Sequence, residues 1–307
     1  MNNQFWEVSG QMETKDQLEQ ELRRIEKWEK DQKNAWFWEK WSRLPFMLLD
    51  RLTPKVIQDK LAEGLGEVGR FLQTGGQYLV QRRSILKRLE RTHSLMRSGP
   101  EGSRAPEPAD GHDGGDGAGL TLAEAANLPL AVMDSVADEL TASRAKLAAA
   151  QGATTGIGGV LTLAIDIPAV LGLSLKVLQE IAVCYGYDPR DEKERLFIVK
   201  CLQFASADIV GKKAVLDELG QFDGEHAPAQ VMSQIQGWRE VVQTYRDSFG
   251  WKKLFQLVPI AGILFGSISN KGTIEDVAEA GKMLYRKRRI VTKLRLEQPD
   301  GGIGPAT

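Results

Sequence analysis

The longest apolar stretch of the chain, residues 152–195, constrains the fold more than any other segment. It begins with closely spaced glycines, and between Gly152 and Leu175 its only charged side chain is Asp166. About 20 apolar residues are enough to cross a bilayer, but an ionised Asp at the bilayer centre costs roughly 2.5–3.5 kcal/mol. Pro168 follows closely and cannot donate a backbone hydrogen bond. The stretch is therefore predicted to form two helical pieces that meet near Asp166, rather than one membrane-spanning helix.

Asp166 has two interpretations at this point. It is either the N-cap of the second helical piece, with Pro168 in the first turn, or a buried functional carboxylate with a raised pKa. The cap is the simpler interpretation. Glu180 is the other acid in apolar surroundings, so these two residues are the candidates if the protein uses carboxylate chemistry.

A helix-start signal follows the second apolar piece, which covers residues 169–185. Asp188 is predicted to cap the next helix, with Pro189 at its first position and Asp191 at its third. The same acids stand beside an arginine and could be read as a catalytic cluster. Helix initiation accounts for every one of them, and we favour it.

A second apolar stretch, residues 254–270, repeats this pattern on a smaller scale. Pro259 interrupts it and Asn270 follows it. Closely spaced glycines let helix backbones approach each other, so the two stretches are predicted to pack together at the centre of the fold. The glycines that carry the pattern are Gly156, Gly159, Gly262 and Gly266.

No run of alternating apolar and polar residues indicates a strand, so the sequence predicts a mainly α fold, a multi-helix bundle with the two Gly-rich, Pro-broken segments at its centre. Residues 98–119 are rich in Gly, Pro and acids without a large apolar side chain, which predicts a disordered insertion. It ends at a capping box, in which Thr121 and Glu124 are predicted to open a helix. The predicted parts are a flexible N-terminus (1–12), an N-terminal helical part (13–97), the insertion (98–119), a helical core (120–296) and a flexible tail (297–307).

Composition and motifs exclude several classes of protein. A formal net charge of −1 gives no overall attraction to nucleic acid. Cys184, Cys201 and three scattered histidines indicate neither a disulfide framework nor a metal site. Phosphate-loop, dinucleotide-binding and hydrolase-elbow motifs are absent from the sequence. We therefore expect no cofactor, metal or nucleic-acid partner and, since no apolar leader begins the sequence, a cytoplasmic location.

Two basic clusters are candidates for membrane contact. One lies in the basic end of a predicted helical stretch that follows Pro54 and continues to about residue 97, and the other lies at the end of the last predicted helix. Their cations either complement a helix C-terminus or bind the anionic surface of a membrane. The candidate contact residues are Arg82, Arg83, Arg286, Lys287, Arg288 and Arg289.

The motifs together resemble a known family. A DIPA step at residues 166–169, a long apolar helix and then YGYDPRDEKERLF are similar to the EcsC family of bacterial proteins. The proline and glycines of the second stretch, followed by YRKRR, agree with that family's closing segment. The resemblance covers most of residues 18–290 apart from the insertion. The family is named for a third gene beside an ABC-type exporter, and the resemblance implies no settled activity.

Two functions follow as hypotheses. The first, which we favour, is a non-enzymatic helical protein on the cytoplasmic face of the cell membrane, attached peripherally and binding lipid or a membrane protein such as an ABC-type exporter. The alternative is a hydrolase with Asp166 and Glu180 in a buried cleft.

Overall fold

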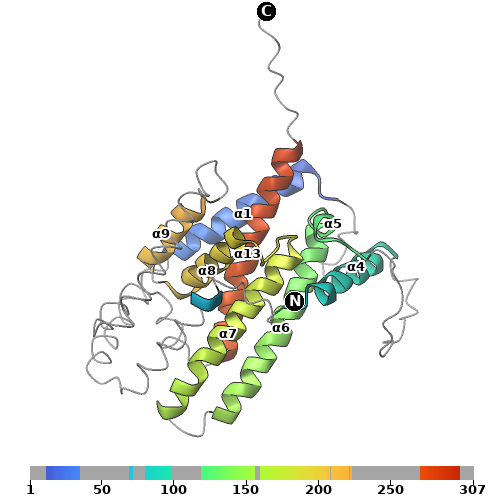
Figure 1. Ribbon diagram of the computed structural model, residues 1–307. Coiled ribbons are helices and arrows are strands. Elements are labelled where there is room, and N and C mark those ends of the chain that lie inside the picture. Colours follow the sequence, from blue (N-terminus) through green and yellow to red (C-terminus); the bar gives the residue numbers. More distant parts are fainter. Residues whose placement is uncertain are drawn as a thin grey trace, which may run out of the picture.

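The computed structural model describes residues 12–34, 69–71, 80–98, 119–155, 160–207, 209–220, 222 and 270–297. Its regular elements over these ranges are α-helices, so the prediction of a mainly α fold is confirmed (Figure 1). In chain order they are α1 (Lys15–Asn34), α4 (Arg82–Ser98), α5 (Leu122–Ala125), α6 (Leu130–Thr155), α7 (Val160–Cys184), α8 (Glu192–Ser206), α9 (Ile209–Gly220) and α13 (Asn270–Glu297).

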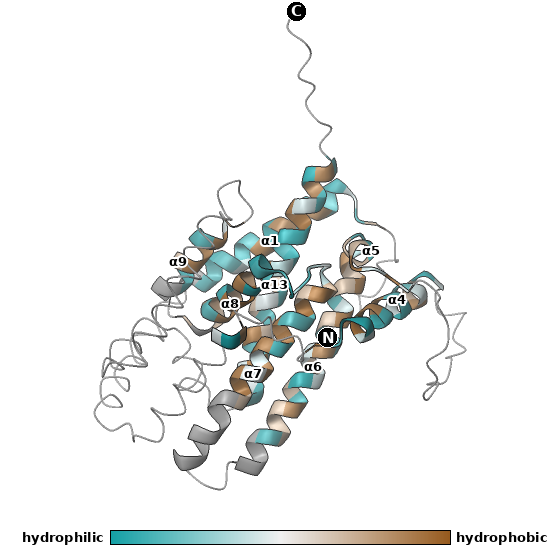
Figure 2. Ribbon diagram, in the orientation of Figure 1, coloured by the Kyte–Doolittle hydropathy of each residue, from teal (hydrophilic) through white to brown (hydrophobic). Residues whose placement is uncertain are grey.

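Three long helices, α6, α7 and α13, pack against one another at the centre (Figure 1). Helix α8 packs on α7 and α13, α1 packs on α13 and α9, and α4 lies against α6 and α7. Figure 2 shows that α7 is mostly hydrophobic along its described length. Its residues from Leu173 to Cys184 are buried apart from Lys176, because neighbouring helices cover this segment on several sides. The apolar stretch of the sequence is thus the core helix of the bundle.

Helix α7 corrects the predicted break. The helix begins at Val160 and continues through Asp166 and Pro168, so Asp166 is not an N-cap. Pro168 removes one backbone hydrogen bond at a cost of about 3 kcal/mol. Burial of the segment that follows outweighs this cost, because packing of apolar faces supplies most helix stability in proteins. The side chain of Asp166 lies outside the described part of the chain.

The end of α7 is fixed by Gly186. Its φ of 77° is left-handed, and a Cβ at this position would lie 2.5 Å from the Ala126 Cα. The Tyr187 N–H donates to the Ala182 carbonyl at 2.9 Å and the Gly186 N–H to the Val183 carbonyl at 3.0 Å. This Schellman arrangement satisfies the last carbonyls of α7 and turns the chain against α5.

The start of α8 also differs from the prediction. The N-cap is Asp191, whereas Asp188 opens a turn in which the Asp191 N–H donates to the Asp188 carbonyl at 3.0 Å. Pro189 takes the second position of this turn, which its fixed φ suits. The predicted helix start was therefore three residues too early. The physical reason is that arginines occupy the Asp188 carboxylate, as described below.

Some of the other predicted features are confirmed, and the rest lie outside the residues that the structure describes. The capping box from Thr121 to Glu124 is present, with both reciprocal hydrogen bonds. Asn270 is the first residue of α13. Several residues of the two glycine patterns lie outside the described part of the chain, namely Gly156, Gly159, Pro259, Gly262 and Gly266, as does most of the predicted insertion.

Candidate functional site

The two acids of the hydrolase hypothesis are not brought together. Glu180 is 4 % exposed and forms a bidentate pair with Arg144 of α6, at 2.8 Å from Nε and 2.6 Å from Nη2. Asp166 lies in the same continuous helix, fourteen residues earlier. At 1.5 Å per residue, their backbones are roughly 21 Å apart along the axis. Carboxylate pairs that act on one bond lie within about 10 Å of each other.

The basic run of α13, predicted as a lipid contact, is paired with groups of the surrounding helices. Arg286 is 15 % exposed and lies between Glu21 of α1, at 2.7 Å, and Asp134 of α6, at 3.0 Å. Burial lowers the pKa of Arg286, but the charge of Asp134 and the hydrogen bond to Glu21 together outweigh that effect. The pKa is therefore raised overall, and the guanidinium stays ionised. Lys287 pairs with Glu29 of α1 at 2.8 Å.

The next two arginines lie deeper. Arg288 forms a bidentate pair with Glu194 of α8, with both distances 2.9 Å, and only 10 % of its side chain is exposed. Arg289 donates from Nε to the Tyr185 carbonyl at 2.9 Å. Helix α13 is central, so the cations of this run meet acids and a carbonyl from the surrounding helices. The run from Arg286 to Arg289 therefore holds helices together.

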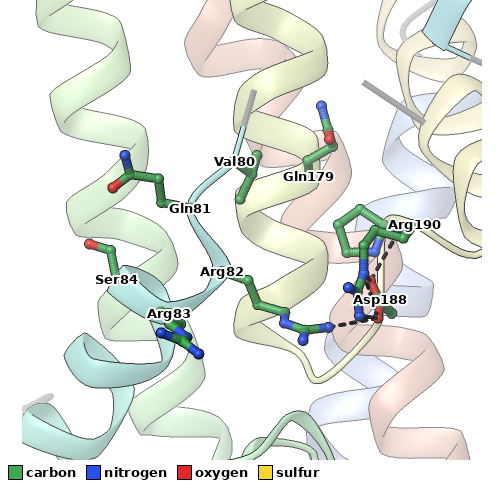
Figure 3. A pocket seen from close by; sticks show the side chains of 9 residues that line it. Val80, Gln81, Arg82, Arg83, Ser84, Gln179, Asp188 and Arg190 are labelled. Carbon is green, nitrogen blue, oxygen red and sulfur yellow. Dashed lines mark hydrogen bonds and ion pairs between the residues drawn. The ribbon is translucent and has the colours of Figure 1, made fainter. Parts of the chain in front are cut away.

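A cavity of about 580 Å³ opens at the start of α4 (Figure 3). Three elements line it: the first residues of α4 with the two before them, one side chain from the last two turns of α7, and the turn between α7 and α8. Its lining residues are Val80, Gln81, Arg82, Arg83, Ser84, Gln179, Asp188, Pro189 and Arg190.

Asp188 holds two arginines in this cavity. Arg82 reaches from α4 and donates from Nη1 to Oδ2 at 2.8 Å (Figure 3). Arg190 donates from Nη2 to the same oxygen at 2.6 Å, and from Nε and its backbone N–H to Oδ1 at 3.0 and 3.1 Å. The hydrogen bond from the Arg190 side chain is the main cause of the lowered pKa of Asp188, so the carboxylate is ionised at neutral pH. Asp188 therefore positions both guanidinium groups.

Gln179 is the polar residue that α7 contributes. It is 2 % exposed, and its Nε2 donates to the Leu175 carbonyl of the preceding turn at 3.1 Å. Its Oε1 accepts no hydrogen bond from any residue that the structure describes. The buried side-chain polar atom without a partner among the described residues is Ser174 Oγ, so Gln179 Oε1 is open to the cavity rather than enclosed in the core.

The outer face of α4 is strongly basic. Ile85, Leu86 and Leu89 on the opposite face are buried against the core. Within the described ranges, four exposed cations of this helix have no acidic partner, and Glu90 is the one exposed acid between them. These cations are Arg83, Lys87, Arg91 and Arg97. Arg88 differs, since it pairs with Glu139 of α6.

The sequence anticipated part of this site. Arg82 and Arg83 were candidates for membrane contact, and both line the cavity. Asp188 and Pro189 were assigned to helix initiation, and the structure places them in the cavity wall. Gln179 was not predicted. Its only sequence signal is that it interrupts the apolar surface of α7.

The described residues contain neither a membrane-spanning helix nor a metal-binding cluster. No helix within them combines the length and the apolar character that spanning a bilayer requires. No group of three His, Cys, Asp or Glu side chains within them is arranged to hold a metal ion.

Comparison with known proteins gives a family match over most of the chain. The model of the EcsC protein family matches residues 19–290. The chain is 53% identical over 283 residues to the "Uncharacterized protein YdbA" of Bacillus subtilis (strain 168), covering 92% of this chain and 96% of that protein. It is 30% identical over 161 residues to "Protein EcsC" of the same organism, covering 52% of this chain and 65% of that protein. No solved structure matches the chain significantly.

Proposed function

This chain belongs to the EcsC protein family, and we propose that it is a non-enzymatic helical protein that attaches peripherally to the cytoplasmic face of the cell membrane, with α4 as its lipid-binding element. The observation that carries the proposal is the exposed face of α4. Arg83, Lys87 and Arg91 follow one another at four-residue spacing there, and no described acid pairs with them.

The expected attachment is electrostatic. A Lys or Arg near an anionic membrane contributes about 1 kcal/mol, and this attraction falls off within a Debye length. Three such cations together contribute about 3 kcal/mol, which corresponds to roughly a hundred-fold change in binding. The apolar face of α4 is packed on α6 and α7, so it is not available to insert into lipid. Binding should therefore be reversible and weakened by salt.

A lipid surface suits this face better than a membrane protein does. Protein interfaces have an apolar core with few charges. On α4 the one large exposed apolar side chain among the described residues is Leu95. The enzymatic alternative has less support, because Glu180 is neutralised by Arg144.

The test is sedimentation with vesicles of phosphatidylcholine that contain phosphatidylglycerol, at low salt. The triple variant Arg83→Gln, Lys87→Gln and Arg91→Gln should bind roughly a hundred-fold more weakly than the wild type. The matched control neutralises three exposed cations of α1, namely Arg23→Gln, Lys27→Gln and Lys30→Gln. The control should bind like the wild type.

Two results would contradict the proposal. One is a wild-type protein that stays in the supernatant with anionic vesicles at low salt. The other is an equal loss of binding in both triple variants, which would mean that net charge rather than α4 drives attachment.

A further inference from the structure

We propose that the cavity at the start of α4 binds a phosphodiester headgroup that also carries a free hydroxyl group, with the arginines taking the phosphate and Gln179 the hydroxyl. The inference rests on the proposed function, since it names the lipid that α4 would meet at the membrane. It goes further because it predicts selection among lipids of equal charge.

The hydrogen-bond donors that face the cavity are suited to bind a phosphate. The Asp188 carboxylate accepts hydrogen bonds from one terminal nitrogen of Arg82. It also accepts them from the Nε and one terminal nitrogen of Arg190. The remaining N–H groups of both guanidiniums have no partner in the described part of the chain, and neither has the side chain of Arg83. Because Asp188 fixes two of the three guanidiniums, they are preorganised to bind phosphate oxygens in their planar, forked geometry.

The charge at this helix end supports an anionic ligand. The first turn of α4 contains two arginines and no acid. A cation near a helix N-terminus is unfavourable because that end carries partial positive charge. A bound anion would attract both the arginines and the positive helix end, and so would offset the repulsion between them. It would also accept hydrogen bonds from the first backbone N–H groups. The three arginines and Asp188 leave the lining with a net positive charge.

Gln179 is suited to accept a hydrogen bond from a hydroxyl group of the ligand. Both oxygens of Asp188 already accept hydrogen bonds from arginines, so that carboxylate is occupied. The lining side-chain acceptors that lack a partner among the described residues are then Gln81, Ser84 and the Oε1 of Gln179. Gln81 and Ser84 are exposed to water, whereas Gln179 is 2 % exposed, so its Oε1 is the acceptor that gains most from a ligand. An ionised phosphodiester has no proton to donate to it. An ammonium group would be repelled by the arginines, so a neutral hydroxyl is the donor that fits both groups.

The size of the cavity agrees with this ligand. Its volume of about 580 Å³ accommodates a glycerol phosphate headgroup, and small-molecule sites are commonly about 300–1,000 Å³. The cavity shares Arg83 with the basic face of α4, so a headgroup could enter while its acyl chains stay in the bilayer.

The experiment compares two vesicle preparations of equal surface charge. One contains phosphatidylglycerol, whose headgroup has free hydroxyls, and the other contains the same fraction of phosphatidylmethanol, which has none. The wild type should bind phosphatidylglycerol vesicles about three- to ten-fold more tightly, as expected for one additional hydrogen bond in a desolvated site. The variant Gln179→Met, of similar size, should bind both preparations equally and keep the wild-type affinity for phosphatidylmethanol.

A second arm separates a lipid from a soluble ligand and does not depend on a variant. Glycerol phosphate is added to wild-type protein bound to phosphatidylglycerol vesicles, with methyl phosphate as the control. Release by glycerol phosphate at concentrations at which methyl phosphate has no effect would support the same cavity for lipid and free headgroup. Protection of the protein against thermal unfolding by glycerol phosphate, without any release from vesicles, would overturn the lipid as the source of the headgroup.

The failures of the two proposals are distinguishable. Equal binding of the wild type to both preparations would overturn the headgroup inference and leave membrane attachment by α4 intact. Binding to neither preparation would overturn membrane attachment itself. A lipid preference that persists unchanged in Gln179→Met would show that Gln179 is not the group that selects the hydroxyl.

Discussion

Replacing Arg288 separates a structural role of the α13 cations from a role in membrane contact. Its guanidinium pairs with Glu194 at both terminal nitrogens and stacks on two rings, 4.1 Å from the centre of Phe197 and 4.3 Å from that of Tyr187. The variant Arg288→Gln removes the pair and both stacking contacts. It also leaves the buried carboxylate of Glu194 without its counter-charge, although the Tyr285 hydroxyl at 3.3 Å still donates to it.

The expected loss of stability is large. Removing one partner of a buried ion pair typically costs 3–5 kcal/mol, and a lost cation–π contact adds about 0.5–2 kcal/mol. Because the Tyr285 hydroxyl remains and Gln is polar, we take about 4 kcal/mol for the total. Each kcal/mol lowers the melting temperature of a 150–250-residue domain by about 2–4 °C, so a fall of roughly 8–16 °C is expected. Arg288→Lys keeps the charge but loses the planar, forked guanidinium, so its melting temperature should lie between those of the wild type and Arg288→Gln.

The assay is thermal unfolding followed by circular dichroism, with Arg83→Gln as the exposed control. That control should change stability by no more than about 0.5 kcal/mol. If Arg288→Gln melts within about 2 °C of the wild type and at the same time binds anionic vesicles more weakly, the internal role of Arg288 is wrong. The original interpretation of the basic run as a lipid-binding cluster would then be restored.

Three further predictions follow from single contacts. Arg144→Met should lower the free energy of unfolding by about 3 kcal/mol, because it strands the buried Glu180, and the double variant with Glu180→Leu should recover much of the loss in a double-mutant cycle by urea unfolding. Gly186→Ala should cost at least about 2 kcal/mol in the same assay, since its φ is positive and the new Cβ would overlap Ala126; an unchanged midpoint would contradict the turn geometry. Because the pKa of Asp188 is lowered, the stability it contributes is present above the unfolded-state value of about 3.9 and is lost as the pH falls through the lower folded-state value, so Asp188→Asn should flatten that acid dependence of stability.

Much of the fold could be predicted from local sequence signals. The capping box at Thr121 depends only on residues within one helical turn, so the sequence alone predicts it, and the structure contains it. The apolar character of residues 169–185 could only be accommodated by burial or lipid, and the structure buries it. The break at Asp166 and Pro168 was predicted from the same kind of local rule and was wrong. Tertiary packing of α7 outweighs the lost hydrogen bond there, and a local rule contains no information about packing.

The site was harder to predict because its members are distant in the chain. Asp188 and Arg190 form a local turn, but Arg82 reaches them from more than one hundred residues away. A run of four cations likewise looks the same in sequence whether it faces solvent or acids from other helices. Arg286 to Arg289 face acids and carbonyls, whereas Arg83 and Lys87 are exposed. Only the positions of α1, α6 and α8 around α13 distinguish these cases.

The most direct test is a fluorescent probe on the face of α4 that should meet the membrane. Ser94 is exposed on that face, and the variant Ser94→Cys can be labelled selectively. The native cysteines, Cys184 and Cys201, are fully buried, and burial raises the pKa of both thiols, so they should not react in the folded protein. An equivalent label at Gln20→Cys on α1, which packs on α13 and α9, is the control.

With anionic vesicles at low salt, we expect the environment-sensitive emission of the Ser94→Cys label to shift to shorter wavelength, and we expect high salt to reverse the shift. The Gln20→Cys label should not change. A shift at Gln20→Cys together with no shift at Ser94→Cys, in protein that sediments with the vesicles, would contradict attachment through α4.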